Sequence, residues 1–238
     1  MAYDEYYTTR KPSPAGMRAL AFWHSRMLQI ARRVIPGLAS KTFLEIGPGH
    51  GLLAHACQRS QIEYYGLEMN ENQAKALTLQ GHNVVASTVP PIPQGEPVQV
   101  IWLSHMLEHA NTFSEAKTII QACYDRLDPQ GYVVIIAPDI KHWGEEFWSM
   151  DWSHGFPTTV NRVEQLLNDS GFKISRSMHH TCTFTNPFLA WSLSWMFRIF
   201  MPINLLDFCF LKFVGRQYAH AFMSVFCWRQ IFVVGCKS

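Results

Sequence analysis

The sequence lacks several patterns that would point to a specialised class of protein. Its basic residues form no cluster, and the net charge is only +2 with 16% charged residues, so a nucleic-acid partner is not expected. The six cysteines include no C-x-x-C pair, and we interpret them as reduced, mostly buried thiols. The first residues are polar, which predicts no signal peptide and a cytoplasmic location.

Internal repeats and low-complexity tracts are absent from the sequence as well. The 238 residues are 48% hydrophobic, which is enough apolar material for one complete α/β core with appended helices. We therefore predict a single domain over residues 1–238, with an N-terminal helical segment at 1–39.

The most informative segment that is present, 43–53, runs from an apolar strand into three alternating glycines and then into a helical pattern. Gly47, Gly49 and Gly51 permit positive φ and leave no Cβ between a ligand and the backbone N–H groups. Their spacing is G-x-G-x-G after Glu45, whereas the dinucleotide fingerprint is G-x-G-x-x-G. Because Glu45 would repel a phosphate but attract an ammonium group, this loop favours S-adenosylmethionine (SAM).

The same segment resembles the first motif of the class I SAM-dependent methyltransferases. Other segments match that family in the expected order, and the resemblance covers roughly residues 40–180. They are 62–68, which ends in an acid, 98–103 with the following Leu-Glu-His segment, and 127–138, where Gln130 replaces a common glycine. The resemblance implies SAM as the cofactor.

Hydrophobic periodicity alternates between strand and helix along the chain, which predicts an α/β fold with a parallel sheet. The predicted helices are 17–34, 52–59, 71–80, 113–127 and 161–170, and further strands are predicted at 84–86, 172–178 and 230–236. Prolines exclude regular structure at 89–97. The family resemblance implies a Rossmann-like seven-stranded, mostly parallel sheet with helices on both faces and an antiparallel last strand.

An aromatic-rich segment, 186–228, precedes the last predicted strand and is not needed in a minimal fold of this kind. Arg198, Asp207, Lys212 and two prolines interrupt it before the roughly 20 residues that a membrane-spanning helix requires. We interpret it as a helical insertion that carries too much aromatic area to remain in water. It could pack on the core, cover a hydrophobic acceptor, form a homodimer contact or lie on a membrane surface.

Residues near the predicted strand ends are the candidates for holding the cofactor. Glu68 can accept two hydrogen bonds from a ribose diol. The aspartate that often follows the third strand in this family is missing, so Ser87 is the predicted contact for the adenine. The full predicted cofactor-binding set is Glu45, Gly47, Gly49, Gly51, Glu68, Met69, Ser87, Ser104 and His105.

Two histidines, His154 and His109, are the candidates for the chemistry. A hydroxyl acceptor needs a base to take its proton, and histidine is a common choice. His154 lies in a segment, 151–159, that resembles one found in family members acting on sugars and small metabolites. For both histidines the alternative is a purely structural hydrogen bond. His105 and His109 have the spacing of a helical metal pair, but spacing supplies no third ligand, and no metal is predicted.

These observations predict a SAM-dependent methyltransferase that acts on an oxygen of a small-molecule, sugar or lipid-linked acceptor. The alternatives are N-methylation, or methylation of a membrane-associated lipid or quinone precursor. An alternative of another class is a non-catalytic SAM-binding scaffold. Besides the acceptor, the predicted partners are a second copy of the chain or a peripheral membrane surface, either one contacted through 186–228.

Overall fold

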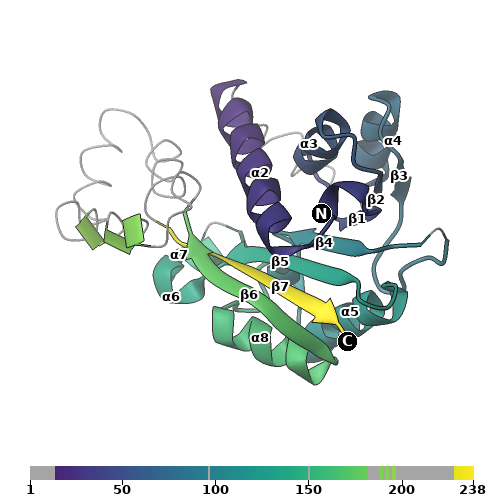
Figure 1. Cartoon of the computed structure of the whole chain (residues 1–238). Helices are drawn as coiled ribbons and strands as arrows, with labels where there is room; N and C mark the ends of the chain where they lie inside the picture. The colour runs from purple at the N-terminus through teal and green to yellow at the C-terminus, as the bar shows by residue number, and fades with distance from the viewer. Residues whose placement is uncertain are drawn as a thin grey trace.

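One seven-stranded sheet forms the centre of the molecule (Figure 1). The structure, a computed structural model, describes residues 14–95, 97–149, 151–181 and 228–238, with helical pairs at 188–189, 191–192 and 195–196. The strands are β1 (Phe43–Ile46), β2 (Tyr64–Glu68), β3 (Val84–Ala86), β4 (Val100–Ser104), β5 (Tyr132–Pro138), β6 (Phe172–His180) and β7 (Gln230–Lys237). Their order across the sheet, β3-β2-β1-β4-β5-β7-β6, confirms the predicted fold class.

Strand direction places the binding edge of the sheet. Neighbouring strands from β3 to β5 pair in parallel, and β7 pairs antiparallel with β5 and with β6, as predicted for the last strand. The chain builds outward from β1 to β3 and then crosses back to β4 on the other side of β1. Ligands of such sheets bind in the crevice at the carboxyl ends of the strands beside this reversal.

Helices cover both faces of the sheet, which confirms a second part of the prediction (Figure 1). One face carries α2 (Pro14–Val34), α3 (Leu52–Arg59) and α4 (Glu71–Leu79), and the opposite face carries α5 (Phe113–Arg126) and α8 (Val160–Asp169). The longest of these, α2, is the predicted N-terminal helix, and it begins three residues earlier than the periodicity indicates.

Capping side chains explain why several helix starts are readable from the sequence. Asn70, Thr112 and Thr159 each accept a hydrogen bond from a backbone N–H in the first turn of α4, α5 and α8. Two short helices, α6 (Ile140–Trp143) and α7 (Glu146–Ser149), are not predicted, because four residues are too few to show a hydrophobic period.

The sheet separates two hydrophobic cores, and successive residues of β4 point alternately into them. Trp102 is fully buried against α2 and α3, with its ring 6.2 Å from Phe43 and 6.3 Å from Phe232, measured between centroids. Ile101 and Leu103 are fully buried in the core shared with α5 and α8. Because β4 is buried on both faces, the carboxyl end of this strand is held rigidly.

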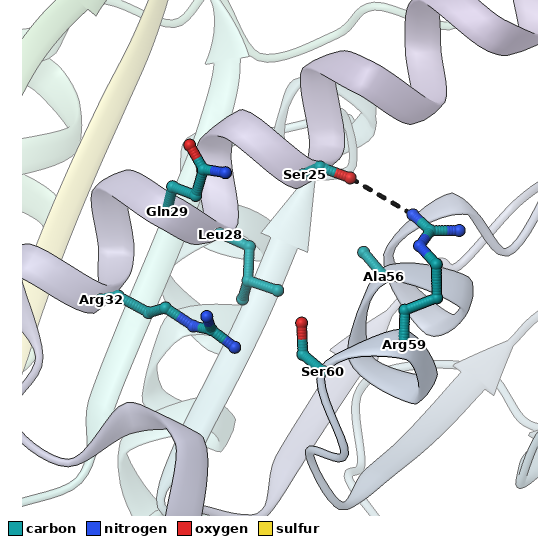
Figure 2. A pocket seen from close by; sticks show the side chains of 7 residues that line it. All are labelled: Ser25, Leu28, Gln29, Arg32, Ala56, Arg59 and Ser60. Carbon is teal, nitrogen blue, oxygen red and sulfur yellow. Dashed lines mark hydrogen bonds between the residues drawn. The ribbon is translucent and has the colours of Figure 1, made fainter.

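The N-terminal helix is attached to the sheet partly through α3. Leu28 of α2 and Ala56 of α3 belong to the same buried cluster. A groove of about 90 Å³ remains between the two helices, and across it Arg59 donates to Ser25 Oγ at 3.3 Å (Figure 2). Arg32 lines the groove from the α2 side (Figure 2). This groove holds none of the predicted site residues and serves helix packing.

Much of the predicted insertion at 186–228 lies outside the described residues. Within its described positions, Phe188, Trp191 and Trp195 are 71%, 51% and 46% exposed. Its role as a lid, a dimer contact or a membrane patch therefore stays a prediction, as does the single-domain boundary. Among the described residues, no helix combines the length and the apolar character that crossing a membrane requires.

The buried environment of Trp102 leads to a stability prediction. Trp102→Ala should lower the free energy of unfolding by about 3–5 kcal/mol, because it removes a large buried side chain between two aromatic rings. Trp148→Ala makes the same chemical change at a side chain that is 47% exposed, and should cost about 0.5 kcal/mol or less. Urea unfolding followed by circular dichroism measures both. Equal losses in the two variants would contradict this packing.

Candidate cofactor and acceptor site

A cavity of about 430 Å³ opens at the carboxyl ends of β1 to β4, where the strand reversal predicts a ligand. This volume lies in the usual range for small-molecule sites. Its walls combine strand-end residues, the segment after β4, the first turns of α5 and the loop at 151–155. The lining residues are Ile46, Gly47, Leu67, Glu68, Met69, Ser87, Val89, His105, Met106, His109, Ala110, Asn111, Glu115, Ile119, Trp152, Ser153 and Gly155.

The glycine turn after β1 is tied to β2 by the carboxylate of Glu68. One oxygen of Glu68 accepts the backbone N–H of Gly49 and the other accepts that of Asn70, both at 3.0 Å. Gln73 from α4 donates to the carbonyl of Gly49 at 2.6 Å. Glu68 is 4% exposed, yet it lines the cavity, so the same carboxylate shapes the turn and faces the ligand space.

The third glycine of the motif has a packing role. Gly51 is the N-cap of α3 with φ +70°, and a Cβ added there would lie 2.4 Å from Leu77 Cδ2 of α4. A side chain at this position would force the buried Leu77 to move and would be strained at this positive φ. The glycine is therefore explained by close helix packing next to the cavity.

Glu45 lies under the glycine turn and is 1% exposed. Tyr64 donates to its carboxyl group at 2.6 Å. The pKa of Glu45 is raised to about 8, mainly by burial and in smaller part by the charge of Glu68, while the hydrogen bond from Tyr64 opposes the rise. Glu45 does not line the cavity, although Ile46 and Gly47 directly after it do.

Six of the predicted site residues line the cavity. They are Gly47, Glu68, Met69, Ser87, His105 and His109. The other five, Glu45, Gly49, Gly51, Ser104 and His154, do not line it: Gly49 is bonded to Glu68, Gly51 packs on α4, and Ser104 ends β4 in register with Ile136. The structure shows the contacts of these residues, and their roles in cofactor binding or catalysis stay predictions.

The segment after β4 carries a hydrogen-bonded pair, His105 and Glu108. His105 adopts φ +53°, an uncommon backbone conformation for a residue other than glycine. Its Nδ1 lies 3.1 Å from Glu108 Oε1 and its Nε2 lies 3.2 Å from Gln230 Oε1. Burial alone would lower the pKa of His105, but the hydrogen bond and charge of Glu108 outweigh it and raise that pKa. Glu108 is fully buried, and its pKa is lowered because the bond and charge of His105 outweigh burial.

His109 is oriented by a chain of hydrogen bonds from the 151–155 loop. Ser153 Oγ donates to Asp151 Oδ1 at 2.6 Å, so its lone pairs accept the Nδ1–H of His109 at 2.8 Å. The described residues offer no hydrogen-bond partner to Nε2 of His109, and this ring lines the cavity. The tautomer set by Ser153 leaves Nε2 as a proton acceptor.

His154 has a different environment from His109. Its side chain is buried, and its Nδ1–H donates to the carbonyl of Phe147. Burial lowers the pKa of His154, which favours the neutral ring. It does not line the cavity, but it packs edge to face against His109 with 5.0 Å between ring centroids. These contacts agree better with a role in holding the ring of His109 in place than with direct contact to a substrate.

The sequence does not reveal several parts of the cavity wall. Glu115 accepts from the backbone and side-chain N–H groups of Asn111 at 2.8 and 3.0 Å. The pattern of Thr112 followed three residues later by Glu115 is a capping box, which could have indicated an ordered turn but not a cavity. Gly155 is also missed: a Cβ there would lie 2.6 Å from the carbonyl oxygen of Ala110.

Comparison with known proteins agrees with this geometry. A family model described as a methyltransferase domain matches residues 18–177, which is well over half of the chain. The chain therefore belongs to this family of methyltransferase domains. A methyltransferase domain needs a methyl donor, and SAM is the donor that the glycine turn predicts.

Solved structures of low sequence identity share the fold. A SAM-dependent methyltransferase from Archaeoglobus fulgidus has a TM-score of 0.60 at 16% identity, covering 91% of this chain and 94% of that one. Phosphoethanolamine N-methyltransferase 2 of Haemonchus contortus, in complex with SAM, has a TM-score of 0.64 at 14% identity, covering 100% of this chain and 60% of that one.

A curated relative is the ubiquinone biosynthesis O-methyltransferase of Pectobacterium carotovorum. It is 29% identical over 117 residues, covering 45% of this chain and 48% of the relative. The match thus spans about half the length of that protein.

The residues at the strand ends fit the cofactor. A buried carboxylate faces the cavity from β2, a glycine turn leaves the backbone at Gly47 accessible, and the hydroxyl of Ser87 lies on the same wall. SAM carries an ammonium, a ribose diol and an adenine, which need an acidic group and further hydrogen-bonding groups of this kind.

Glu68 provides a test of the cofactor site. Glu68→Ala should weaken SAM binding by about 1.5–3 kcal/mol, because a charged acceptor is lost and the turn at Gly49 loses its tether. Isothermal titration calorimetry measures the affinity. Glu71→Ala, at a side chain that is 77% exposed, is the control and should leave the affinity unchanged. Unchanged affinity in the Glu68 variant would contradict the assignment.

Glu45 predicts a specific dependence of stability on pH. Because its folded pKa of about 8 exceeds the ordinary value of 4.5, the unfolded chain releases this proton at lower pH than the folded one. Its contribution to stability is therefore complete below pH 4.5 and is lost as the pH rises to about 8. Glu45→Gln should gain stability relative to the parent across this window, by up to about 1.4 kcal/mol per pH unit.

Urea unfolding at pH 5, 6.5 and 8 measures this difference, with Glu71→Gln as the control for loss of one carboxylate. A constant difference between Glu45→Gln and the parent across the three pH values would show that Glu45 ionises normally in the folded protein.

Proposed function

We propose that this enzyme transfers the methyl group of SAM to a hydroxyl oxygen of a small-molecule, sugar or lipid-linked acceptor. The observation that carries the proposal is the position of His109 on the cavity wall, with Nδ1 bonded to Ser153 and Nε2 available as a base. A hydroxyl acceptor needs such a base, whereas an amine that binds unprotonated does not need it to become a nucleophile.

The bound cofactor would supply an activated methyl group on a sulfonium. With SAM bound, the sulfonium would give up its methyl group to the acceptor oxygen, and Nε2 of His109 would take the hydroxyl proton. Ser153 and Asp151 hold the ring so that Nε2 remains the accepting atom. The products are the methyl ether and S-adenosylhomocysteine, and solvent later removes the proton from His109.

Apolar side chains line the part of the cavity around His109, where the acceptor would bind. Trp152 lines the cavity while its side chain remains 79% exposed, which places an indole at the mouth. Met106 and Ala110 add apolar surface beside His109. An acceptor with an aromatic or aliphatic body and one reactive hydroxyl suits these walls. The curated relative is named as an O-methyltransferase of ubiquinone biosynthesis, which supports an acceptor of this class.

Within this proposal His154 is a positioning residue. Its ring packs on His109 and its own Nδ1–H is already donated to Phe147. Loss of His154 should therefore reduce turnover by altering the orientation of His109.

Replacing His109 tests the base directly. His109→Gln should lower kcat by about 10² to 10⁴ while SAM affinity changes little, because proton transfer is lost and the cavity is retained. Turnover is measured as transfer of labelled methyl groups from SAM to a panel of phenols, sugars, lipid-linked alcohols and amines. His55→Gln, at a histidine paired with His82 outside the cavity lining, is the control.

Three outcomes would contradict the proposal. Normal turnover of His109→Gln would remove this residue as the base. Label found only on nitrogen would indicate an N-methyltransferase. SAM binding without transfer to any acceptor in the panel would favour a non-catalytic scaffold.

A further inference from the structure

Asp139, His142 and His179 form a second cluster of chemically active side chains outside the cavity lining. Asp139 Oδ2 lies 2.6 Å from His179 Nε2 and 3.1 Å from His142 Nδ1. One potential ligand atom from each residue lies within 4.8 Å of the other two. Two imidazole nitrogens therefore lie close to the same carboxylate oxygen.

The three residues come from different elements whose backbones are fixed. Asp139 follows β5 and caps α6, His142 lies in α6, and His179 lies in β6 in register with Ile231 of β7. The backbone N–H of Asp139 donates to the carbonyl of Arg229 at 3.2 Å. The cluster thus joins the end of β5 to β6 across the intervening strand β7.

The carboxylate is oriented by a partner outside the cluster. Asp139 Oδ1 accepts the backbone N–H of Lys141 at 3.0 Å, which turns Oδ2 toward both histidines. Asp139 is 1% exposed, whereas the side chains of His142 and His179 are 19% and 35% exposed. An outer partner that fixes the first ligand is characteristic of metal sites, and so is an open side that admits water.

Charge and dimensions also suit a divalent ion. An aspartate ligand would supply one negative charge to such an ion, and each imidazole would supply one neutral nitrogen. A tetrahedral site with metal bonds of about 2.0–2.1 Å separates its ligand atoms by about 3.3 Å. The separations of 2.6 and 3.1 Å would have to widen by about 0.7 and about 0.2 Å to reach this value.

We propose that Asp139, His142 and His179 bind one divalent transition-metal ion of the Zn²⁺ class, with a fourth position open to solvent. Two imidazoles and one carboxylate are borderline ligands that favour Zn²⁺ or Co²⁺ over Mg²⁺ or Ca²⁺. The ion ties the end of β5 and the start of α6 to β6. The site lies at the carboxyl edge of the sheet but is separate from the cavity residues, so it does not depend on the proposed acceptor.

Titration of the full chain with Co²⁺, after treatment with a chelator, tests the site by visible absorption. We expect one tightly bound Co²⁺ with the spectrum of a four-coordinate ion. Replacement of the metal by Zn²⁺ should raise the unfolding midpoint by roughly 5–10 °C at a hundredfold excess over Kd. His179→Gln and His142→Gln should each weaken Co²⁺ binding at least tenfold.

Two control variants test whether Co²⁺ binds at the proposed residues and not at other histidines. His82→Gln disrupts the His82–His55 pair, whose ring nitrogens lie 3.0 Å apart, and should leave Co²⁺ binding intact. His154→Gln addresses a looser cluster of Glu108, His109 and His154 beside the cavity. Should His179→Gln fail to fold, His142→Gln on the short helix α6 decides the question.

The proposal is overturned if the parent protein binds no Co²⁺ or Zn²⁺ at micromolar concentration. In that case Asp139 and the two histidines are a hydrogen-bonded group only. It is equally overturned if His154→Gln abolishes binding while the His142 and His179 variants bind normally.

Discussion

A single buried carboxylate holds the cofactor end of the sheet together. Glu68 accepts one backbone N–H from the turn after β1 and another from the turn before α4, so it couples two neighbouring strand ends. Hydrogen bonds to a charged acceptor are roughly twice as strong as neutral ones. Their loss would leave the N–H groups of Gly49 and Asn70 without these partners. The geometry of the glycine turn, and with it one wall of the cavity, depends on this residue.

The opposite wall depends on the segment after β4. Glu108 is buried and paired with His105, and its backbone carbonyl accepts the N–H of Phe156 at 3.0 Å. His109 in the same turn is bonded to Ser153. The 151–156 loop is therefore fastened to the β4 turn by backbone and side-chain contacts together. His109, the proposed base, lies in a short 3-10 helix, Leu107–His109, that follows the buried strand β4 closely.

The fold could be predicted almost completely from local patterns, whereas the site could be predicted only in part. Strand ends such as Glu68 and caps such as Thr159 are marked by nearby residues, so periodicity and capping locate them. His109 and Ser153 are 44 positions apart, and no local pattern shows that they meet. The same is true of Asp139 and His179, which are 40 positions apart. Distant pairings follow from sheet order and loop packing, which a single sequence does not display.

The close packing of the backbone at Gly155 against the segment after β4 determines which properties of the cavity a substitution can change. A Cβ atom at Gly155 would lie 2.6 and 2.9 Å from backbone atoms of Ala110 and Asn111. The backbone of the 151–155 loop is therefore packed directly against the backbone of the segment after β4. The width of the cavity is thus set by contacts that contain no side chain. Substitutions at Trp152 or Met106 can then change the polarity and shape of the lining while the spacing of its walls stays the same. Such a scaffold could exchange one acceptor for another without rebuilding the segment that carries the proposed base.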